Sequence, residues 1–263
     1  MEISSFVRTK SLDEAYTLIH EQKAFPIGGG AWSRLNARRI DLAVDLSALG
    51  LLYIRRNGDQ VEIGAMTTAR DIETSEELKA VFGPFFADSV AHIVGVQMKN
   101  IVTAGGTVAG RYGFAELNTA LLAAEAEVVL YREGPVGFEK FLTNRAHGPA
   151  LIEKILISAV DFSGGFSSVR TTANDFPILD AAAVNRKGVW KIAVGARPGS
   201  ARLAPEAAAL LGSEKSPKME KIEKAAEQAA EELSFGNDVR GSAEYRKDVC
   251  VSLVRRAIQE AVR

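Results

Sequence analysis

The chain has 263 residues, with 32 Lys and Arg against 33 Asp and Glu, so its formal charge is −1. This near-neutral balance argues against a nucleic-acid-binding protein and against a polybasic protein of the membrane surface. The single cysteine, Cys250, excludes an internal disulfide, a four-cysteine zinc site and an iron–sulfur cluster held by this chain alone.

The first 160 residues predict a mixture of helices and strands. Ser11, with Glu14 three residues later, forms a capping-box pattern at the start of a helix. Asn57-Gly58 is the dipeptide favoured by a two-residue type I′ turn, so the strands beside it are expected to form a hairpin. The expected elements are a helix over 12–22, strands over 40–46, 51–55 and 60–65, a helical stretch over 68–93, a helix over 116–126, and strands over 127–133 and 150–158.

The pattern changes at the segment FSGGF (162–166), which we expect to mark a domain boundary. Beyond it the sequence predicts three antiparallel strands within 166–196, with a tight turn near Lys187-Gly188, followed by two helices. The last helix, from about Ser242, places Cys250 on an apolar stripe, so Cys250 is interpreted as a core residue rather than a catalytic thiol. Together these elements indicate an α+β fold.

Motifs for hydrolytic or metal chemistry are absent from the sequence. His20, His92 and His147 lack metal-ligand spacing, and neither a nucleophile elbow nor a phosphate-loop signature occurs. We therefore expect no catalytic residue and no metal site. The most apolar tract, 117–130, is too short for the ~20 residues of a membrane span, and no signal-peptide pattern opens the chain, so a cytoplasmic location is expected.

Two glycine-rich segments are the most informative feature of the sequence. PIGGGAWS (26–33) follows an apolar strand, and TAGGT (103–107) precedes a helix rich in Ala and Leu. Glycine lets successive backbone amides point into one concave space and form an anion site, and two such sites match a pyrophosphate. Either segment taken alone is more simply a flexible turn.

The order of the segments around these glycines resembles the flavoprotein subunits of the molybdenum hydroxylases, the family of xanthine dehydrogenase and aerobic carbon monoxide dehydrogenase. The resemblance covers essentially the whole chain. It is carried by GGGA (28–31), IGAMTTARDI (63–72), QMKNIVTAGGT (97–107), LLAAEAEVVL (121–130) and DVRGSAEYRKDVCVSLVRRAI (238–258).

The resemblance implies a two-lobed FAD-binding domain of the PCMH (vanillyl-alcohol-oxidase-like) type over 1–160, with lobes of about 1–56 and 57–160. It implies a smaller domain over 161–263, of the CO dehydrogenase flavoprotein type, with a three-stranded antiparallel sheet and helices. The implied cofactor is FAD, held between the lobes.

The resemblance also implies the residues of the cofactor site. Glu116 stands where an acidic residue contacts the FAD in relatives, Arg170 where a basic residue lies near the flavin, and Ile152 where an apolar residue touches its rings. The two loops around the diphosphate are expected to act mainly through backbone amides, and the Thr103 hydroxyl is expected to donate to phosphate. These loops comprise Pro26, Ile27, Gly28, Gly29, Gly30, Ala31, Trp32, Ser33, Thr103, Ala104, Gly105, Gly106 and Thr107.

Several positions depart from the family pattern. Ala31 and Trp32 replace Thr and Asp, Thr107 replaces Asn, Lys99 replaces Arg and Glu116 replaces the shorter Asp. Recognition by backbone amides tolerates such changes better than recognition by side chains, so FAD binding is expected to survive them.

The resemblance further implies that the chain is the electron-transfer subunit of a molybdopterin-dependent dehydrogenase. A large molybdopterin-binding partner would oxidise the substrate, a small iron–sulfur partner would relay electrons, and this chain would deliver them through flavin to NAD or another acceptor. The near absence of cysteine agrees with this division. Two alternatives remain at this point: a stand-alone FAD oxidoreductase and a flavin-free scaffold subunit.

Overall fold

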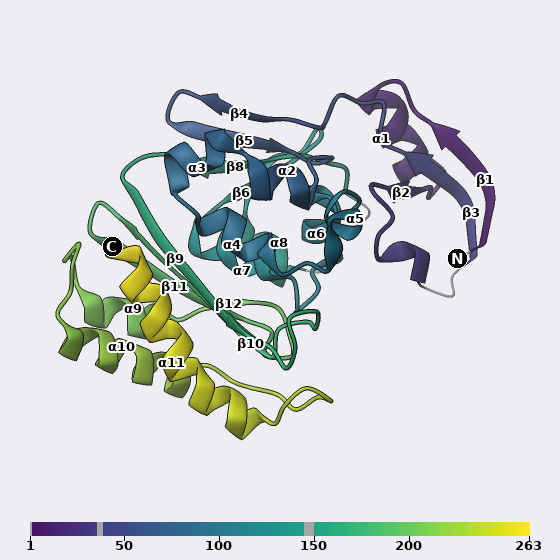
Figure 1. Cartoon of the computed structure of the whole chain (residues 1–263). Helices are drawn as coiled ribbons and strands as arrows, with labels where there is room; N and C mark the ends of the chain where they lie inside the picture. Colours follow the sequence, from purple (N-terminus) through teal and green to yellow (C-terminus); the bar gives the residue numbers. More distant parts are fainter. Residues whose placement is uncertain (1, 36–38, 145–149) are drawn as a thin grey trace.

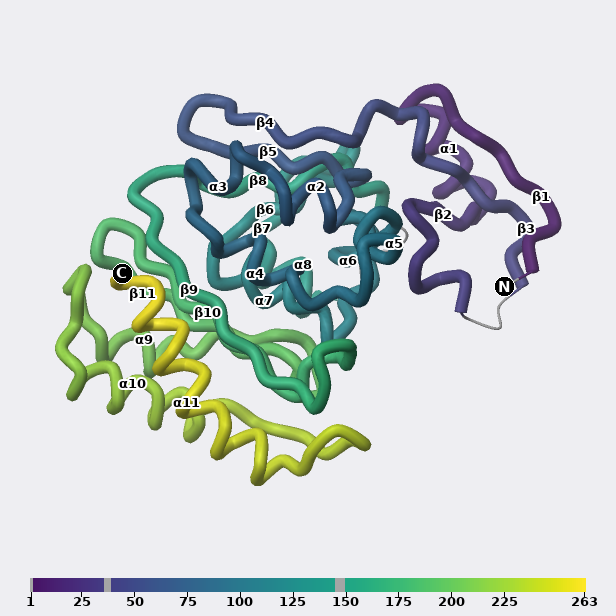
Figure 2. Tube along the Cα trace, in the orientation of Figure 1, coloured from purple at the N-terminus to yellow at the C-terminus, as the bar shows by residue number. Residues whose placement is uncertain are grey.

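The computed structural model describes residues 2–35, 39–144 and 150–263. Within these residues the backbone forms three β-sheets that follow one another along the sequence (Figure 1). The two ends of the described chain lie on opposite sides of the molecule (Figure 2). None of the helices in these ranges is long and apolar enough to cross a lipid bilayer.

The N-terminal lobe contains a three-stranded parallel sheet in the order β1-β3-β2. The Ser11 side chain accepts a hydrogen bond from the Glu14 amide, which confirms the predicted helix to within one residue. The Glu14 carboxylate accepts from the Lys10 amide, not from Ser11, so the cap is not a reciprocal box. The elements are β1 (Glu2–Arg8), α1 (Leu12–Glu21), β2 (Phe25–Ile27), the 3-10 helix η1 (Ser33–Leu35) and β3 (Arg39–Asp45).

The central layer is a five-stranded antiparallel sheet in the order β4-β5-β8-β6-β7. The expected hairpin forms, but its two loop residues are Gly58 and Asp59, because Asn57 pairs with Gln60. Only Gly58 of the two has a positive φ, which indicates a type II′ turn instead of type I′. The strands are β4 (Ile54–Asn57), β5 (Gln60–Gly64), β6 (Glu127–Leu130), β7 (Gly134–Gly137) and β8 (Ile152–Ser158).

Seven short helices accompany this sheet in the described chain. The helical stretch predicted over 68–93 is divided into three, because Ser75 caps a new helix and Gly83, at φ +60°, ends it before Pro84. The helices are α2 (Ala69–Thr74), α3 (Glu76–Phe82), α4 (Phe85–Ala91), α5 (Gly95–Lys99), α6 (Ala104–Gly110), α7 (Glu116–Ala123) and α8 (Phe138–Thr143).

The C-terminal part is an antiparallel sheet in the order β12-β11-β10-β9 with three helices. The three long strands confirm the prediction, and β12 adds two residues at the edge. Two helices were expected, but a seven-residue helix that starts at Pro205 precedes them. The elements are β9 (Phe162–Val169), β10 (Leu179–Arg186), β11 (Val189–Gly195), β12 (Arg202–Leu203), α9 (Pro205–Leu211), α10 (Met219–Glu232) and α11 (Ala243–Ala261).

The segment FSGGF, expected as a boundary, is the first part of strand β9. Its glycines serve packing: a Cβ atom on Gly165 would lie 2.2 Å from the carbonyl oxygen of Ala257 in α11. Gly165 therefore lets the last helix approach the sheet, an arrangement seen in Figure 1, while a Cβ atom on Gly164 would meet the rings of Phe162 and Phe85 instead.

Strand β10 is covered on both faces, which explains its unbroken apolar run. Ala182 and Val184 belong to the core shared with α7. Ala181 and Ala183, on the opposite face, pack with α10 and α11, and Cys250 is buried in that second core as expected. The C-terminal sheet is thus a layer between α7 and the two long helices, and this arrangement brings its residues close to the central helices.

Candidate functional site

A cavity of about 550 Å³ lies where the N-terminal lobe, the central helices and the start of the C-terminal part meet. This volume falls within the ~300–1,000 Å³ typical of sites for small molecules and cofactors. Four stretches of chain contribute most of its wall: residues 25–33, the region from α4 to α6, residues 112–117, and residues 170–177.

The two glycine-rich loops meet at one side of this cavity. A Cβ atom on Gly28 would lie 2.8 Å from Oγ1 of Thr103, and Gly29 is packed directly against the backbone of Ile101. Most residues of both loops line the cavity. The predicted convergence of two distant loops on one space is therefore what the structure shows.

The backbone amides of the two loops differ in their hydrogen bonds. Within the described residues, none of the amides of Gly28, Gly29, Gly30 or Ala31 donates a hydrogen bond to another part of the protein. The first loop therefore has free donors, as a site for an anion requires.

The second loop was expected to offer a similar set of free amides, and this expectation is wrong. The Ala104 amide donates to the Thr67 carbonyl oxygen and the Gly105 amide to that of Ala65, both at 2.8 Å. The Gly106 amide donates to Oγ1 of Thr103, which caps helix α6. These amides already donate hydrogen bonds, to the helix cap and to the segment after β5, so they are not available to a ligand. What remains is the Thr103 hydroxyl proton, which has no acceptor among the described residues.

Glu116 and Arg170 form a buried ion pair in the cavity wall. Nη2 of Arg170 lies 2.5 Å from Oε1 of Glu116, with the two side chains 9% and 6% exposed. Arg170 also donates to Oγ of Ser168 and to the Asp175 carbonyl oxygen. Burial raises the pKa of Glu116, and the neighbouring guanidinium opposes this shift. The opposite charges of the two side chains cancel, and both side chains are shielded from water.

Trp32 does not close the cavity. Its ring centroid lies 4.9 Å from that of Phe114, 5.3 Å from that of Tyr112 and 5.7 Å from that of Phe176. These four rings, which we call the aromatic wall, join the first loop to residues 112–114 and to the segment before β10. All four residues line the cavity, which stays open beside them.

Three predicted site residues lie outside the cavity lining. Ile27 pairs with Asp45 inside the N-terminal sheet. Gly105 faces Ala65, and a Cβ atom added to Gly105 would lie 2.8 Å from the carbonyl oxygen of Ala65. Ile152 is buried in strand β8 within the core of the central layer, so the structure does not bring it to the wall.

Several wall residues were not predicted. His92 lines the cavity although it is exposed, and partial burial together with Arg170 and Lys99 lowers its pKa. Tyr112, Phe114 and Phe176 had no motif to mark them. Their aromatic character near the second glycine loop and before β10 was the one signal present.

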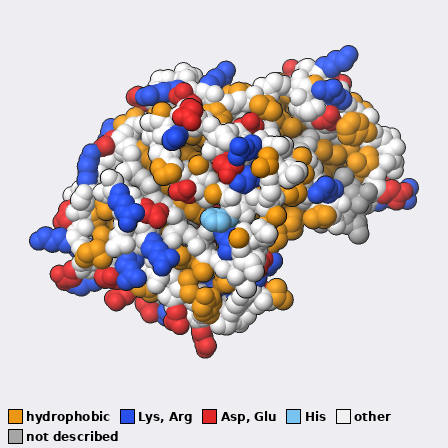
Figure 3. Space-filling model, in the orientation of Figure 1, with side chains coloured by type: hydrophobic (Ala, Val, Ile, Leu, Met, Phe, Trp, Pro, Cys, Tyr) orange, Lys and Arg blue, Asp and Glu red, His pale blue; other side chains and the backbone are white. Residues whose placement is uncertain are grey.

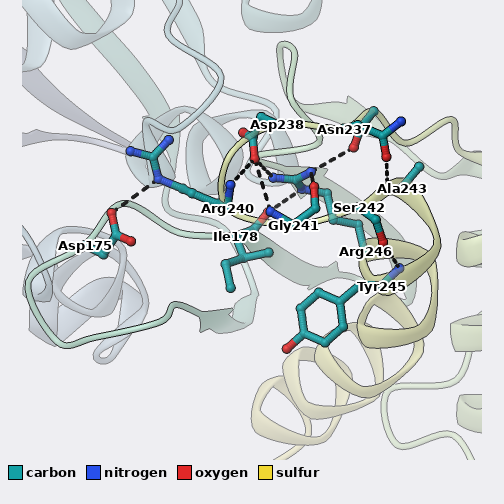
Figure 4. Close-up of polar contacts among 11 residues, drawn as sticks. Asp175, Ile178, Asn237, Asp238, Arg240, Gly241, Ser242, Ala243, Tyr245 and Arg246 are labelled. Atoms are coloured by element: carbon teal, nitrogen blue, oxygen red, sulfur yellow. Dashed lines mark hydrogen bonds and ion pairs between the residues drawn. The ribbon is translucent and has the colours of Figure 1, made fainter.

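The segment before β10 is held from outside by the residues that precede α11. Arg240 donates from Nε to Oδ1 of Asp175 at 3.2 Å, and its guanidinium carbon lies 5.1 Å from the ring centroid of Phe176. Figure 4 shows how Arg246, fully buried, anchors the loop that carries Arg240. Arg246 donates to Oδ1 of Asp238 and to backbone carbonyl oxygens of Ile178, Gly236 and Gly241.

Charged side chains of both signs are interspersed on the face shown in Figure 3, without a broad area of one sign. This face therefore gives no electrostatic reason to expect a polyanion such as nucleic acid.

Comparison with known proteins identifies the group to which this architecture belongs. Residues 2–162 match the FAD binding domain in molybdopterin dehydrogenase, and residues 165–261 match the CO dehydrogenase flavoprotein C-terminal domain. The nicotine 6-hydroxylase medium subunit of Paenarthrobacter nicotinovorans is 30% identical, over 95% of this chain and 94% of that one. The carbon monoxide dehydrogenase medium chain of Hydrogenophaga pseudoflava is 25% identical, over 96% of this chain and 94% of that one.

Solved structures show the same fold. Carbon monoxide dehydrogenase from Hydrogenophaga pseudoflava matches with a TM-score of 0.89 and 24% identity, over 98% of this chain and 96% of that one. Quinoline 2-oxidoreductase from Pseudomonas putida 86 matches with a TM-score of 0.88 and 22% identity, over 100% and 97% of the two chains. The chain therefore belongs to the FAD-binding flavoprotein subunits of the molybdopterin dehydrogenases, and its cofactor is FAD.

Proposed function

We propose that this chain is the electron-transfer subunit of a multi-subunit molybdopterin-dependent dehydrogenase. A large molybdopterin-binding partner would oxidise the substrate and pass the electrons to iron–sulfur clusters of a small partner. This chain would receive the electrons from those clusters and deliver them to NAD or another acceptor. The observation that carries this proposal is the cavity itself, which is lined by the first glycine loop with its free amides, by Thr103 and by the Glu116–Arg170 pair.

The residues present fit the FAD diphosphate. The unbonded amides of Gly28 to Ala31 supply donors without side chains, so the replacement of Thr and Asp by Ala31 and Trp32 leaves them intact. We assign the diphosphate to this loop and to the Thr103 hydroxyl, and the flavin end to the region of Glu116 and Arg170. This assignment supports a division into a cofactor domain over 1–160 and a second domain over 161–263, with Arg170 reaching back from the second.

Bound FAD supplies the ability to exchange electrons singly or in pairs. The chain's own residues exclude water and fix charge: the aromatic wall covers one side, and the buried Glu116–Arg170 pair keeps the opposing charges balanced. With one cysteine in its sequence, the chain has no set of ligands for a cluster, which supports placing the iron–sulfur relay on another polypeptide.

Names of related proteins support the assembly. The relatives include subunits called medium subunit, medium chain and subunit alpha of a dehydrogenase complex, and two solved relatives are named for copper, molybdenum or a molybdenum cofactor. The free, buried Cys250 supports a reducing compartment, so we propose that the complex works in the cytoplasm.

Purification of the chain from its native cell through an affinity tag tests the proposal. We expect two further polypeptides, with FAD, molybdenum and iron in fixed ratio to the chain. Recovery of the chain with FAD but without metals or other polypeptides would instead identify a stand-alone flavoprotein. Recovery with partners but without flavin would identify a scaffold.

The acceptor is tested on the purified complex with its reduced flavin. Addition of NAD is expected to reoxidise the flavin and produce NADH, measured by absorbance. A flavin that stays reduced with NAD but is reoxidised by a quinone or an electron-transfer protein would exclude NAD as acceptor while leaving the subunit role in place.

A further inference from the structure

Asp180 is a buried acid that the site described above does not use. It lies in strand β10, is 0% exposed, and neither carboxylate oxygen has a hydrogen-bond partner in the described chain. A buried carboxylate without donors is costly in its charged form, so such a group calls for an explanation.

The neighbours of Asp180 in the sheet place it beside the cavity wall. Ser168 of β9 lies directly opposite on one side, and Gly195 of β11 lies directly opposite on the other. Side chains of directly opposed residues project to the same face, about 5 Å apart. Ser168 Oγ accepts a hydrogen bond of 2.7 Å from Arg170, so Asp180 shares a face with the group that holds this arginine.

Helix α7 covers that face. A Cβ atom on Gly195 would lie 2.1 Å from Oγ1 of Thr119 and 2.5 Å from Oδ1 of Asp180, so the missing side chain makes room for both groups. Thr119 is one helical turn from Glu116 and therefore lies on the same side of α7. Glu116, Arg170 and Asp180, which we call the buried cluster, thus gather between α7 and the sheet.

The charges of the buried cluster do not balance unless one acid is neutral. Arg170 is the one base and is engaged by Glu116. Burial and the charge of Glu116 raise the pKa of Asp180 to about 8, while Thr119 and Arg170 oppose the shift.

The other elements packed here add little charge. Strand β11 contributes Gly195, which has no side chain. Partial burial, followed by the charges of Arg170 and Lys99, lowers the pKa of His92 after α4 and so favours its neutral form. Asp180 therefore decides whether the buried cluster is neutral or carries one net negative charge.

We propose that Asp180 is a positioning residue that sets the charge of the cavity wall facing the FAD, being neutral when it holds a proton and adding one negative charge when it loses it. The proposal rests on the proposed placement of the flavin near Glu116 and Arg170. A negative charge behind the wall disfavours electron uptake by a nearby cofactor. Loss of this proton therefore lowers the reduction potential of the bound flavin beyond the change that the flavin's own protons cause.

The test is a redox titration of the full-length, FAD-loaded chain from pH 6 to pH 10, followed by the flavin absorbance. We expect Asp180→Asn to match the unaltered protein at pH 6 and to have a higher potential above pH 8, because the amide cannot ionise. Parallel curves over the whole range would overturn the proposal. If the unaltered chain takes up no FAD at all, the proposed function fails instead.

Two further variants keep the test decisive. Thr119→Val removes the neighbouring hydroxyl that lowers the pKa of Asp180, so the additional fall in potential is expected to move to higher pH. An unchanged or lower midpoint would contradict the proposal. Glu260→Gln is the matched control, since Glu260 is another acid whose pKa is raised by burial, but it lies on α11 outside the cavity lining. Its curve is expected to follow that of the unaltered protein.

Discussion

Gly29 and Ile101 are in such close contact that a Cβ atom on Gly29 would lie 1.6 Å from the Ile101 carbonyl oxygen. No side chain fits this space without displacing backbone. The contact fixes the first glycine loop against the segment that leads into the second, although the two are far apart in the sequence. The shape of the cavity between them depends on this contact.

Gly29→Ala is therefore expected to separate the two loops and to weaken FAD binding at least tenfold, which corresponds to about 1.4 kcal/mol. Isothermal titration of the purified chain with FAD measures the change. Gly137→Ala is the matched control, because nothing lies within 4 Å of the added Cβ at that position. Equal affinity of the two variants would show that the contact does not shape the site.

Arg170→Met is expected to leave Glu116 buried without a partner. Removal of one member of a buried ion pair typically costs about 3–5 kcal/mol of unfolding free energy. Because burial already raises the pKa of Glu116, protonation can relieve part of this cost at low pH, so the loss should be larger at pH 8 than at pH 5.

Urea unfolding at the two pH values measures this loss. Arg170→Lys, which keeps the charge, serves as control and is expected to lose clearly less stability. If Arg170→Met had the same free energy of unfolding as Arg170→Lys at pH 8, the ion pair would contribute nothing measurable to stability.

The raised pKa of Asp180 is expected to make the stability of the folded chain depend on pH. Its pKa is raised from 3.8 to about 8 in the folded chain, so between these values the folded state binds a proton that the unfolded state releases. The associated stability is full below about pH 4, falls by at most about 1.4 kcal/mol per pH unit, and is lost once the pH passes 8. Asp180→Asn removes this dependence.

The difference in unfolding free energy between Asp180→Asn and the unaltered chain should thus shift in favour of the variant as the pH rises from 5 to 8. Denaturant unfolding at each pH unit gives the curve. A difference that stays constant across this range would mean that Asp180 keeps an ordinary pKa.

Arg246→Met is expected to destabilise the C-terminal part by about 3 kcal/mol or more, because three carbonyl oxygens and Asp238 lose a buried charged partner (Figure 4). Thermal unfolding followed by circular dichroism measures the loss. Arg256→Met, on the exposed side of the same helix, should stay within about 0.5 kcal/mol. Similar losses in both variants would assign the effect to the helix instead of to the network.

The sequence predicts elements with clear local patterns well. The Ser11 cap, the apolar α7 and the three long C-terminal strands each depend on residues a few positions apart, and each is found in the structure. Breaks inside a helical pattern are harder to predict, because a residue such as Ser75 can either continue a helix or start a new one.

The site is predictable only where its residues lie in one motif. The glycine loops and Glu116 were found in this way, but the free amides of the second loop were wrongly predicted, because the hydroxyl and carbonyl partners of those amides come from Thr103 and from the segment after β5. The aromatic wall unites Trp32, Phe114 and Phe176 from three separate stretches, and Asp180 sits inside an apolar strand. Such contacts exist only in three dimensions.

The placement of FAD between the glycine loops and the aromatic wall is tested most directly by the fluorescence of Trp32 during titration with FAD. The sequence has two tryptophans, so in a Trp190→Phe background Trp32 is the sole reporter. We expect its emission to be quenched in step with FAD binding and to saturate at one FAD per chain. FAD that binds without any change in Trp32 emission would contradict the placement of the cofactor between the glycine loops and the aromatic wall.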